Sequence, residues 1–156
     1  MSVAARLSDV SYRFYDRLRH RQAFEVARSE GSAPDLSALQ GHKYALVVTF
    51  KRSGEPVPTP VWFGLDDQGL LYFHSEPRSA KVRRIRRDPH IRVAPCNMRG
   101  KPMGAVAEGR ARVVGEEENA RAEAVIQANY GLGRRLYEAP IDRSGLDFVY
   151  VEVTPT

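Results

Sequence analysis

The sequence of 156 residues has one cysteine, Cys96, and no apolar run that approaches the roughly 20 residues a membrane-spanning helix needs. A single cysteine excludes an intramolecular disulfide, and any metal site would need other ligand types. Residues 1–9 lack the apolar segment of a signal peptide. We therefore expect a reduced, cytoplasmic protein that does not insert into a membrane.

Common catalytic and metal-binding motifs are also missing. The 4 histidines show no metal-ligand spacing, and no Cys-x-x-Cys pattern occurs. There is no Gly-x-Ser-x-Gly elbow, no Gly-x-Gly-x-x-Gly fingerprint and no Walker loop. Cys96 lies in an expected strand and is interpreted as a small buried residue rather than a nucleophile. We predict no metal site and no obligate catalytic side chain.

The composition is that of an ordinary globular domain, with 42% hydrophobic and 28% charged residues. The net charge is 24 − 19 = +5. Residues 75–101 carry nine basic and two acidic side chains, a net 9 − 2 = +7, so the rest of the chain carries −2. A localised basic region indicates an anionic partner: a nucleic acid, an acidic membrane surface or a phosphorylated cofactor.

Hydrophobic periodicity predicts short strands interrupted by helices. Prolines at positions 56, 58 and 60 place the second strand at a sheet edge or a bulge, because proline donates no backbone hydrogen bond. The expected helices are 9–28, 79–87 and 115–129, with a short helical turn at 35–39. The expected strands are 44–50, 57–64, 70–74, 90–96, 103–114 and 148–153.

This order predicts a mainly β protein, a closed or partly closed β-barrel with peripheral helices, and not a doubly wound sheet. We expect a single domain over residues 1–156. Residues 1–40 would form a helical N-terminal extension, and residues 41–156 the barrel with its helical insertions.

Two segments could carry chemistry. Ser79–Pro89 combines a helix start, a capping hydroxyl and basic side chains, which together favour an anion. Val82 and Ile85, three residues apart, are expected to face the core, and Lys81 and Arg84 to share an exposed, solvated face. The alternative is a solvated basic helix with Ser79 as a plain cap. Thr59–Phe63 is a proline-interrupted strand, whose unpaired backbone groups could bind the edge of a flat ring; the alternative is an edge strand with a core tryptophan.

These two segments, taken in order with their neighbours, resemble the split β-barrel superfamily of pyridoxamine 5′-phosphate oxidase, and most closely its F420-dependent (deazaflavin) oxidoreductase branch. The resemblance covers residues about 40 to 135. It rests on Lys43–Phe50, Gly54–Trp62, Lys81–Pro89, Val93–Cys96 with Arg99-Gly100, and Glu108–Ala111.

The resemblance implies an FMN-binding-like split barrel in a homodimer, with the cofactor in a groove between subunits. The serine and lysine at the helix start would hold the cofactor phosphate, and the partner's residues near 130–135 would close the site. The cofactor-binding residues it implies are Thr59, Pro60, Val61, Trp62, Ser75, Ser79, Ala80, Lys81 and Arg84.

Departures from the family pattern favour F420 over FMN. Ala80 stands where flavin-binding members commonly have an arginine, and no C-terminal tryptophan and arginine motif of true pyridoxamine phosphate oxidases is found. We therefore predict an F420-dependent oxidoreductase that transfers a hydride to a small organic substrate. An FMN-binding oxidoreductase of the same fold is the first alternative. A non-enzymatic protein that carries flavin, or contacts nucleic acid through the basic helix, is the second, although no aromatic-interleaved motif supports nucleic-acid binding.

Overall fold

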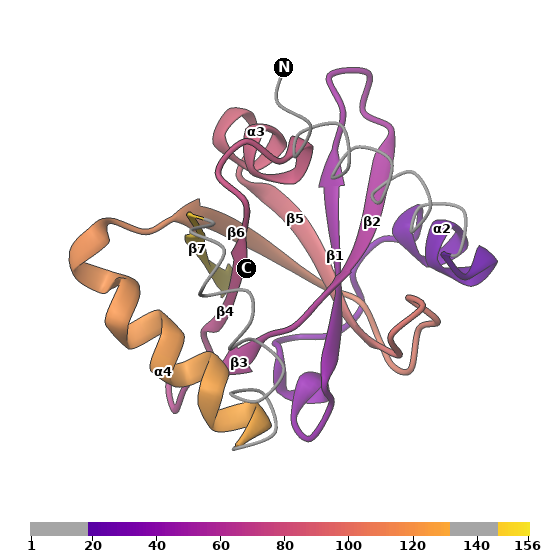
Figure 1. The fold of residues 1–156 in the computed structure, drawn as a ribbon. Helices are drawn as coiled ribbons and strands as arrows, with labels where there is room; N and C mark the ends of the chain where they lie inside the picture. Colours follow the sequence, from indigo (N-terminus) through magenta and orange to yellow (C-terminus); the bar gives the residue numbers. More distant parts are fainter. Residues whose placement is uncertain (1–18, 132–146) are drawn as a thin grey trace.

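One antiparallel sheet organises the computed structural model, which describes residues 19–131 and 147–156 (Figure 1). The sheet order is β2-β1-β5-β6-β7-β4-β3. This mainly β architecture confirms the predicted fold class. The strands are β1 Tyr44–Phe50, β2 Pro56–Val61, β3 Gly64–Leu65, β4 Leu71–Ser75, β5 His90–Cys96, β6 Ala107–Val113 and β7 Val149–Pro155.

The connection between β2 and β3 requires the sheet to curl. These two strands lie at opposite edges of the sheet, yet only Trp62 and Phe63 separate them in the chain. Three Cα–Cα steps of about 3.8 Å reach at most about 11 Å, so the two edges must approach each other. The sheet is therefore a partly closed barrel, and its inner face carries the main hydrophobic core.

The prolines of β2 lie at the sheet edge, as predicted, although the strand ends at Val61 instead of residue 64. Pro56, Pro58 and Pro60 lie opposite residues of β1 in the register, but they have no N–H to donate to it, so they alternate with the residues whose backbone can donate. Since backbone groups of successive strand residues point to opposite sides, the outer edge of β2 presents the proline carbonyls and no proline N–H.

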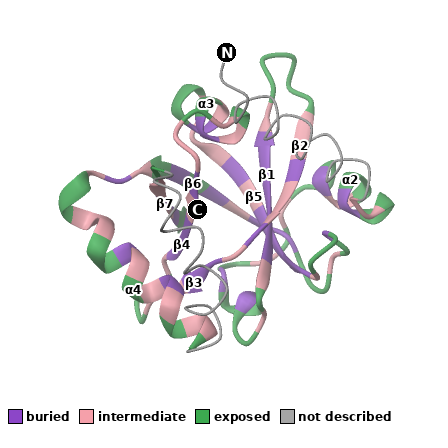
Figure 2. Ribbon diagram, viewed as in Figure 1, coloured by how far each residue is buried: buried purple, intermediate pink, exposed green. Residues whose placement is uncertain are grey.

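Three α-helices cover the described parts of the sheet: α2 Arg21–Ala27, α3 Ala80–Arg87 and α4 Asn119–Tyr130. Two 3-10 turns, η1 Ser37–Leu39 and η2 Glu116–Glu118, complete the elements. Buried residues line the sheet and the inward sides of the helices, whereas the outer sides of α3 and α4 are exposed (Figure 2). No helix in residues 19–131 and 147–156 is long and apolar enough to cross a membrane.

Two further predicted elements are wrong in extent. The helix expected over 9–28 cannot run continuously, because His20 is extended (φ −63°, ψ 137°) and its Nδ1 caps the helix that starts at Arg21; residues 9–18 lie outside the described residues. The strand expected over 103–114 begins only at Ala107. Before it, the carbonyl of Val106 accepts hydrogen bonds from the backbone of Ser32 and Ala33, which hold the chain against the 32–33 segment.

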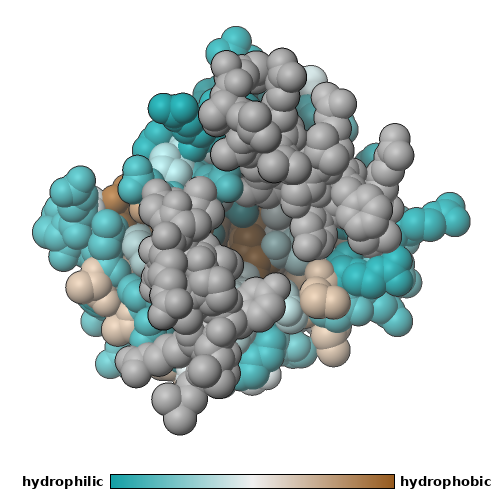
Figure 3. Space-filling model, in the orientation of Figure 1, coloured by the Kyte–Doolittle hydropathy of each residue, from teal (hydrophilic) through white to brown (hydrophobic). Residues whose placement is uncertain are grey.

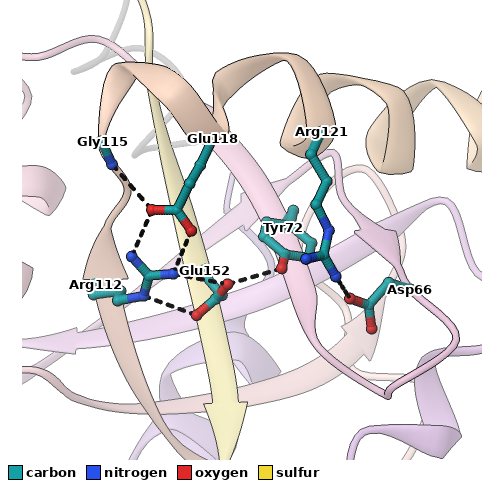
Figure 4. A network of polar contacts seen from close by, with 7 residues as sticks. All are labelled: Asp66, Tyr72, Arg112, Gly115, Glu118, Arg121 and Glu152. Atoms are coloured by element: carbon teal, nitrogen blue, oxygen red, sulfur yellow. Dashed lines mark hydrogen bonds and ion pairs between the residues drawn. The ribbon is translucent and has the colours of Figure 1, made fainter.

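A polar network attaches η2 and the start of α4 to the sheet (Figure 4). Arg112 bonds Glu118 at 2.7 Å and Glu152 at 2.8 Å, and Tyr72 donates its hydroxyl to Glu152 at 2.8 Å. Hydrogen bonds from Arg112 lower the pKa of Glu118 to about 2. Burial, followed by the bond to Glu152, raises the pKa of Tyr72 to about 12. Farther along α4, Arg121 pairs with Asp66.

Candidate functional site

Helix α3 covers the end of the barrel where β1 and β4 finish (Figure 1). Thr49 and Ser75 are the buried polar residues of the described chain, with 1% and 8% exposure, and both lie beneath this helix. Thr49 Oγ1 accepts a hydrogen bond from Arg84 Nε at 2.7 Å. Ser75 Oγ lies 3.0 Å from Ser79 Oγ. The buried polar groups of the barrel are therefore satisfied by α3, which fixes the helix at this position.

The start of α3 has the geometry of an anion site. Ser79 is extended, and its hydroxyl accepts from the backbone N–H of Val82 at 3.3 Å, so Ser79 is the predicted cap. By helix geometry, the N–H groups of Ala80 and Lys81 have no carbonyl partner within the helix. These two donors and the positive end of the helix dipole meet at one point, beside the exposed Ala80.

Lys81 bends over the barrel end instead of extending into solvent, which corrects the expectation that it lies on a solvated face. Its Nζ lies 5.4 Å from the centroid of the buried Phe73 ring. Burial, together with the nearby charges of Arg84 and Arg19, lowers the pKa of Lys81 to about 8. No carboxylate of the described chain forms an ion pair with it. Its charge is thus available to a bound anion.

Arg84 also differs from expectation. We predicted that it shares an exposed face with Lys81, but it is half-buried because its guanidinium reaches Thr49. The exposed cations of α3 are instead Arg83, Arg86 and Arg87. The Arg87 guanidinium donates to the backbone carbonyl of Phe50. Val82 and Ile85 are buried, as predicted.

The predicted ring-binding strand runs along the neighbouring edge. The register places Thr59 opposite Val47 and Val61 opposite Ala45, with Val61 in the core inside the barrel. Because Pro58 and Pro60 cannot donate, the pairing groups of β2 belong to the residues between them. The carbonyls of the prolines therefore face outward and have no partner within the sheet, which agrees with the expectation that this strand leaves backbone groups unpaired.

Trp62 follows β2 and is half-buried, with its ring centroid 5.5 Å from that of Tyr130 at the end of α4. Tyr130 was expected to act from a partner subunit. Here its hydroxyl accepts from the Phe63 N–H at 2.9 Å and donates to the Lys43 carbonyl of the same chain. Residues 132–135, expected beside it in the partner, lie outside the described residues.

The site residues therefore form two groups. Ser75, Ser79, Lys81 and Arg84 gather at the α3 end, and Ala80 lies at the helix start. Thr59, Pro60, Val61 and Trp62 follow β2 away from it. Thr49, the acceptor for Arg84 of the first group, lies opposite Val57 of β2. Trp62 follows Val57 by five residues, which is about 16 Å of extended chain. In the space-filling view, apolar atoms are visible in the middle of this face, between the regions where Figure 1 has β4 and β1 (Figure 3).

Sequence reasoning missed Thr49 and Phe73. Thr49 is the one polar side chain between apolar residues in the run Tyr-Ala-Leu-Val-Val-Thr-Phe, which was an available signal. Phe73 becomes part of the site only because the Lys81 side chain lies across its ring, and the sequence around Phe73 does not indicate this contact. Within the described ranges, no group of three or more His, Cys, Asp or Glu could hold a metal ion. Cys96 is buried, as predicted, and burial raises the pKa of its thiol to about 12.

Comparisons with known proteins give a family and a fold. Residues 36–156 match the family described as pyridoxamine 5′-phosphate oxidase. Curated proteins gave no match. Similar solved structures include a FAD-binding protein from Mesorhizobium loti (17% identity, 76% of this chain and 82% of that chain, TM-score 0.54). Another is the heme storage protein of Vibrio cholerae (16% identity, 78% of this chain and 91% of that chain, TM-score 0.55). A third is a protein described as F420 reductase (19% identity, 80% of this chain and 95% of that chain, TM-score 0.50). At these identities the structures establish the fold alone.

Proposed function

Because the chain belongs to the pyridoxamine 5′-phosphate oxidase family, we propose that it binds a flavin-type cofactor, that this cofactor is the deazaflavin F420, and that the protein is an F420-dependent oxidoreductase. The cofactor phosphate would bind at the start of α3, and its ring would lie along β2 between Thr59 and Trp62.

The observation that carries the proposal is the anion site at α3. The N–H groups of Ala80 and Lys81 have no carbonyl partner within the helix, the hydroxyls of Ser75 and Ser79 lie 3.0 Å apart at the same end of the helix, and the Lys81 side chain begins in this first turn. Lys81 has no carboxylate partner among the described residues, although it is half-buried. A phosphate supplies the negative charge that this arrangement lacks. About 16 Å of extended chain separates Trp62 from Val57, the residue opposite Thr49, which accepts the hydrogen bond from Arg84 of α3. This span suits an elongated ligand with a phosphate at one end and a ring system at the other.

Two features favour F420 over FMN. Ala80 provides no guanidinium at the first helical position, where the resemblance places an arginine in flavin-binding relatives. F420 carries a phosphodiester and an anionic polyglutamate tail. The exposed Arg83 presents positive charge about one turn from the helix start, and Arg86 adds charge farther along the helix.

In this proposal the residues of the chain bind and orient, while the bound cofactor supplies hydride-transfer chemistry. Lys81 and the α3 N–H groups fix the anionic end. On β2, the side chains of Thr59 and Val61 lie on the inner face of the strand. The proline carbonyls lie along its outer edge. The apolar floor of the barrel around Phe73 excludes water from the site. No side chain is assigned as an obligate proton donor.

The test is a titration of the purified protein with F420 and, separately, with FMN, followed by absorption and fluorescence at physiological salt. Tighter binding of F420, weakened as salt rises, supports the proposal. Tighter binding of FMN would contradict the choice of F420 and indicate an FMN-binding oxidoreductase of the same fold. Binding of either cofactor without turnover over a panel of electron-poor alkenes and nitro compounds would indicate a carrier.

We further propose a cytoplasmic homodimer, in which the proline edge of β2 is covered by the second subunit. The outer edge of β2 offers no proline N–H, so this contact would not continue the sheet from one subunit to the other. Sedimentation at micromolar concentration should give a dimer. A stable monomer would contradict both the dimer and a site completed by the partner.

A further inference from the structure

We propose that Asn129 and Tyr130, the last two residues of α4, are positioning residues that hold the closing segment Trp62–Phe63 in place and thereby set the ring-binding end of the site. This inference rests on the proposed function, because it assigns these residues to the orientation of the cofactor ring.

The two side chains satisfy both backbone groups of Phe63. Its N–H donates to the Tyr130 hydroxyl at 2.9 Å, and its carbonyl accepts from Asn129 Nδ2 at 2.9 Å. The same Nδ2 donates to the His42 carbonyl at 3.0 Å, and the Tyr130 hydroxyl donates to the Lys43 carbonyl. Each side chain therefore bridges the segment before β1 to the segment after β2.

The sheet itself cannot supply these bonds. Phe63 lies between β2, at one edge of the sheet, and β3, at the other, so neither ladder includes it. Its side chain is buried, with 1% exposure, and unpaired backbone groups at such a position would be costly. Helix α4 can reach them because it packs directly on Gly64, where a Cβ would lie 2.2 Å from the Val125 carbonyl oxygen.

Trp62 is the residue whose position depends on these bonds. It precedes Phe63, and its ring packs on that of Tyr130 at 5.5 Å, tilted by 36°. The Lys43 ammonium lies 5.5 Å from the Tyr130 ring centroid and donates to the Asn129 carbonyl. Helix α4 thus orients the chain at the far end of β2, whereas α3 contacts β1 through Arg84 and Thr49.

The chain provides its own reporter, since Trp62 is the only tryptophan in the sequence. The test uses the full chain with Tyr130→Phe, which removes the bridging hydroxyl and keeps the ring. Its matched control is Tyr150→Phe, which removes a hydroxyl that bonds Glu123 on the same helix, at 2.6 Å, away from the closing segment. Asn129→Asp, which removes the bridging donor, is the second variant.

Tyr130→Phe removes both hydrogen bonds of the bridging hydroxyl. Because the effect reaches the cofactor only through Trp62, F420 binding should weaken by about 2- to 10-fold, the equivalent of about one neutral hydrogen bond. Binding of inorganic pyrophosphate, a probe of the α3 end alone, should not change. Acrylamide should quench Trp62 fluorescence more strongly in Tyr130→Phe and Asn129→Asp than in wild type. Tyr150→Phe should match wild type in all three measurements.

Equal F420 affinity in wild type and Tyr130→Phe would overturn the positioning role and leave the proposed function intact. Equal losses of F420 and pyrophosphate affinity would also overturn it, because they would indicate general loss of structure. If wild-type protein binds neither F420 nor FMN, the proposed function and this role fall together.

Discussion

Lys81 should make anion binding depend on pH in a range where an ordinary lysine would not. Replacement by methionine keeps an apolar chain of similar length over Phe73 and removes the charge. A charge-assisted hydrogen bond contributes about 1.5–3 kcal/mol. Below pH 8, Lys81→Met should therefore weaken F420 binding by about 10- to 150-fold, since about 1.4 kcal/mol is tenfold.

The pH dependence follows from the lowered pKa. Burial and the charges of Arg84 and Arg19 bring the pKa of Lys81 to about 8, so the unliganded protein loses this charge as pH rises through that value. A bound phosphate favours the ammonium and raises its pKa. Wild-type affinity should fall by up to about tenfold per pH unit above pH 8. Lys81→Met should lack this slope, and the two proteins should converge in affinity at high pH.

A stability measurement separates this effect from unfolding. A lysine whose folded pKa is below its unfolded value destabilises the fold at all pH values below about 8, and this penalty disappears as pH rises toward about 10.4. Lys81→Met should thus be at least as stable as wild type in urea at pH 7. Arg86→Met, at the exposed far end of α3, should reduce affinity only slightly. Wild-type affinity that stays flat from about pH 7.5 to 9.5 would refute the reasoning.

Three further predictions concern the fold around the site. Gly64→Ala should destabilise the protein by about 1–3 kcal/mol or more in urea unfolding, because the new methyl group collides with the backbone of α4; unchanged stability would contradict the direct packing of α4 on β3. Thr49→Val should lower the free energy of unfolding by about 1–3 kcal/mol, because it removes the buried hydroxyl that accepts from Arg84 Nε. It should also weaken F420 binding, which Tyr150→Phe should not. Glu118→Gln should reduce the free energy of unfolding at pH 6 but match wild type near pH 2. A carboxyl with a lowered pKa contributes stability that is lost as pH falls from about 4.5 to 2. A difference in the free energy of unfolding that persists at pH 2 would argue against the ion pair with Arg112.

Local sequence signals were sufficient for the elements whose residues decide their own conformation. The strand Tyr44–Phe50 and the strand His90–Cys96 have the predicted bounds, because a short run of β-branched and apolar residues ended by turn residues has few alternatives. Helix α3 begins after Ser79 and ends at Arg87, before the extended Asp88, as its cap and the following proline predict. The edge position of β2 followed from its prolines alone.

Local signals failed where distant segments compete for the same backbone. Strand β6 starts at Ala107 because the backbone N–H groups of Ser32 and Ala33 donate to the Val106 carbonyl. The expected first helix is interrupted at His20, which is the N-cap of α2 and whose backbone N–H donates to the Arg99 carbonyl. Neither pairing can be read from a helical or strand period, since both join residues that are far apart in the chain.

The sequence by itself determined the residue types of the site: a capped basic helix, a proline edge strand, and no nucleophile or metal motif. Only the tertiary structure decided how these residues are used. It placed Lys81 over Phe73, where burial lowers its pKa, and it turned Arg84 inward to Thr49. It also set Tyr130 against Trp62 through the closure of the barrel. Burial and long-range contacts are properties of the folded chain, because each depends on which segments the curled sheet brings together.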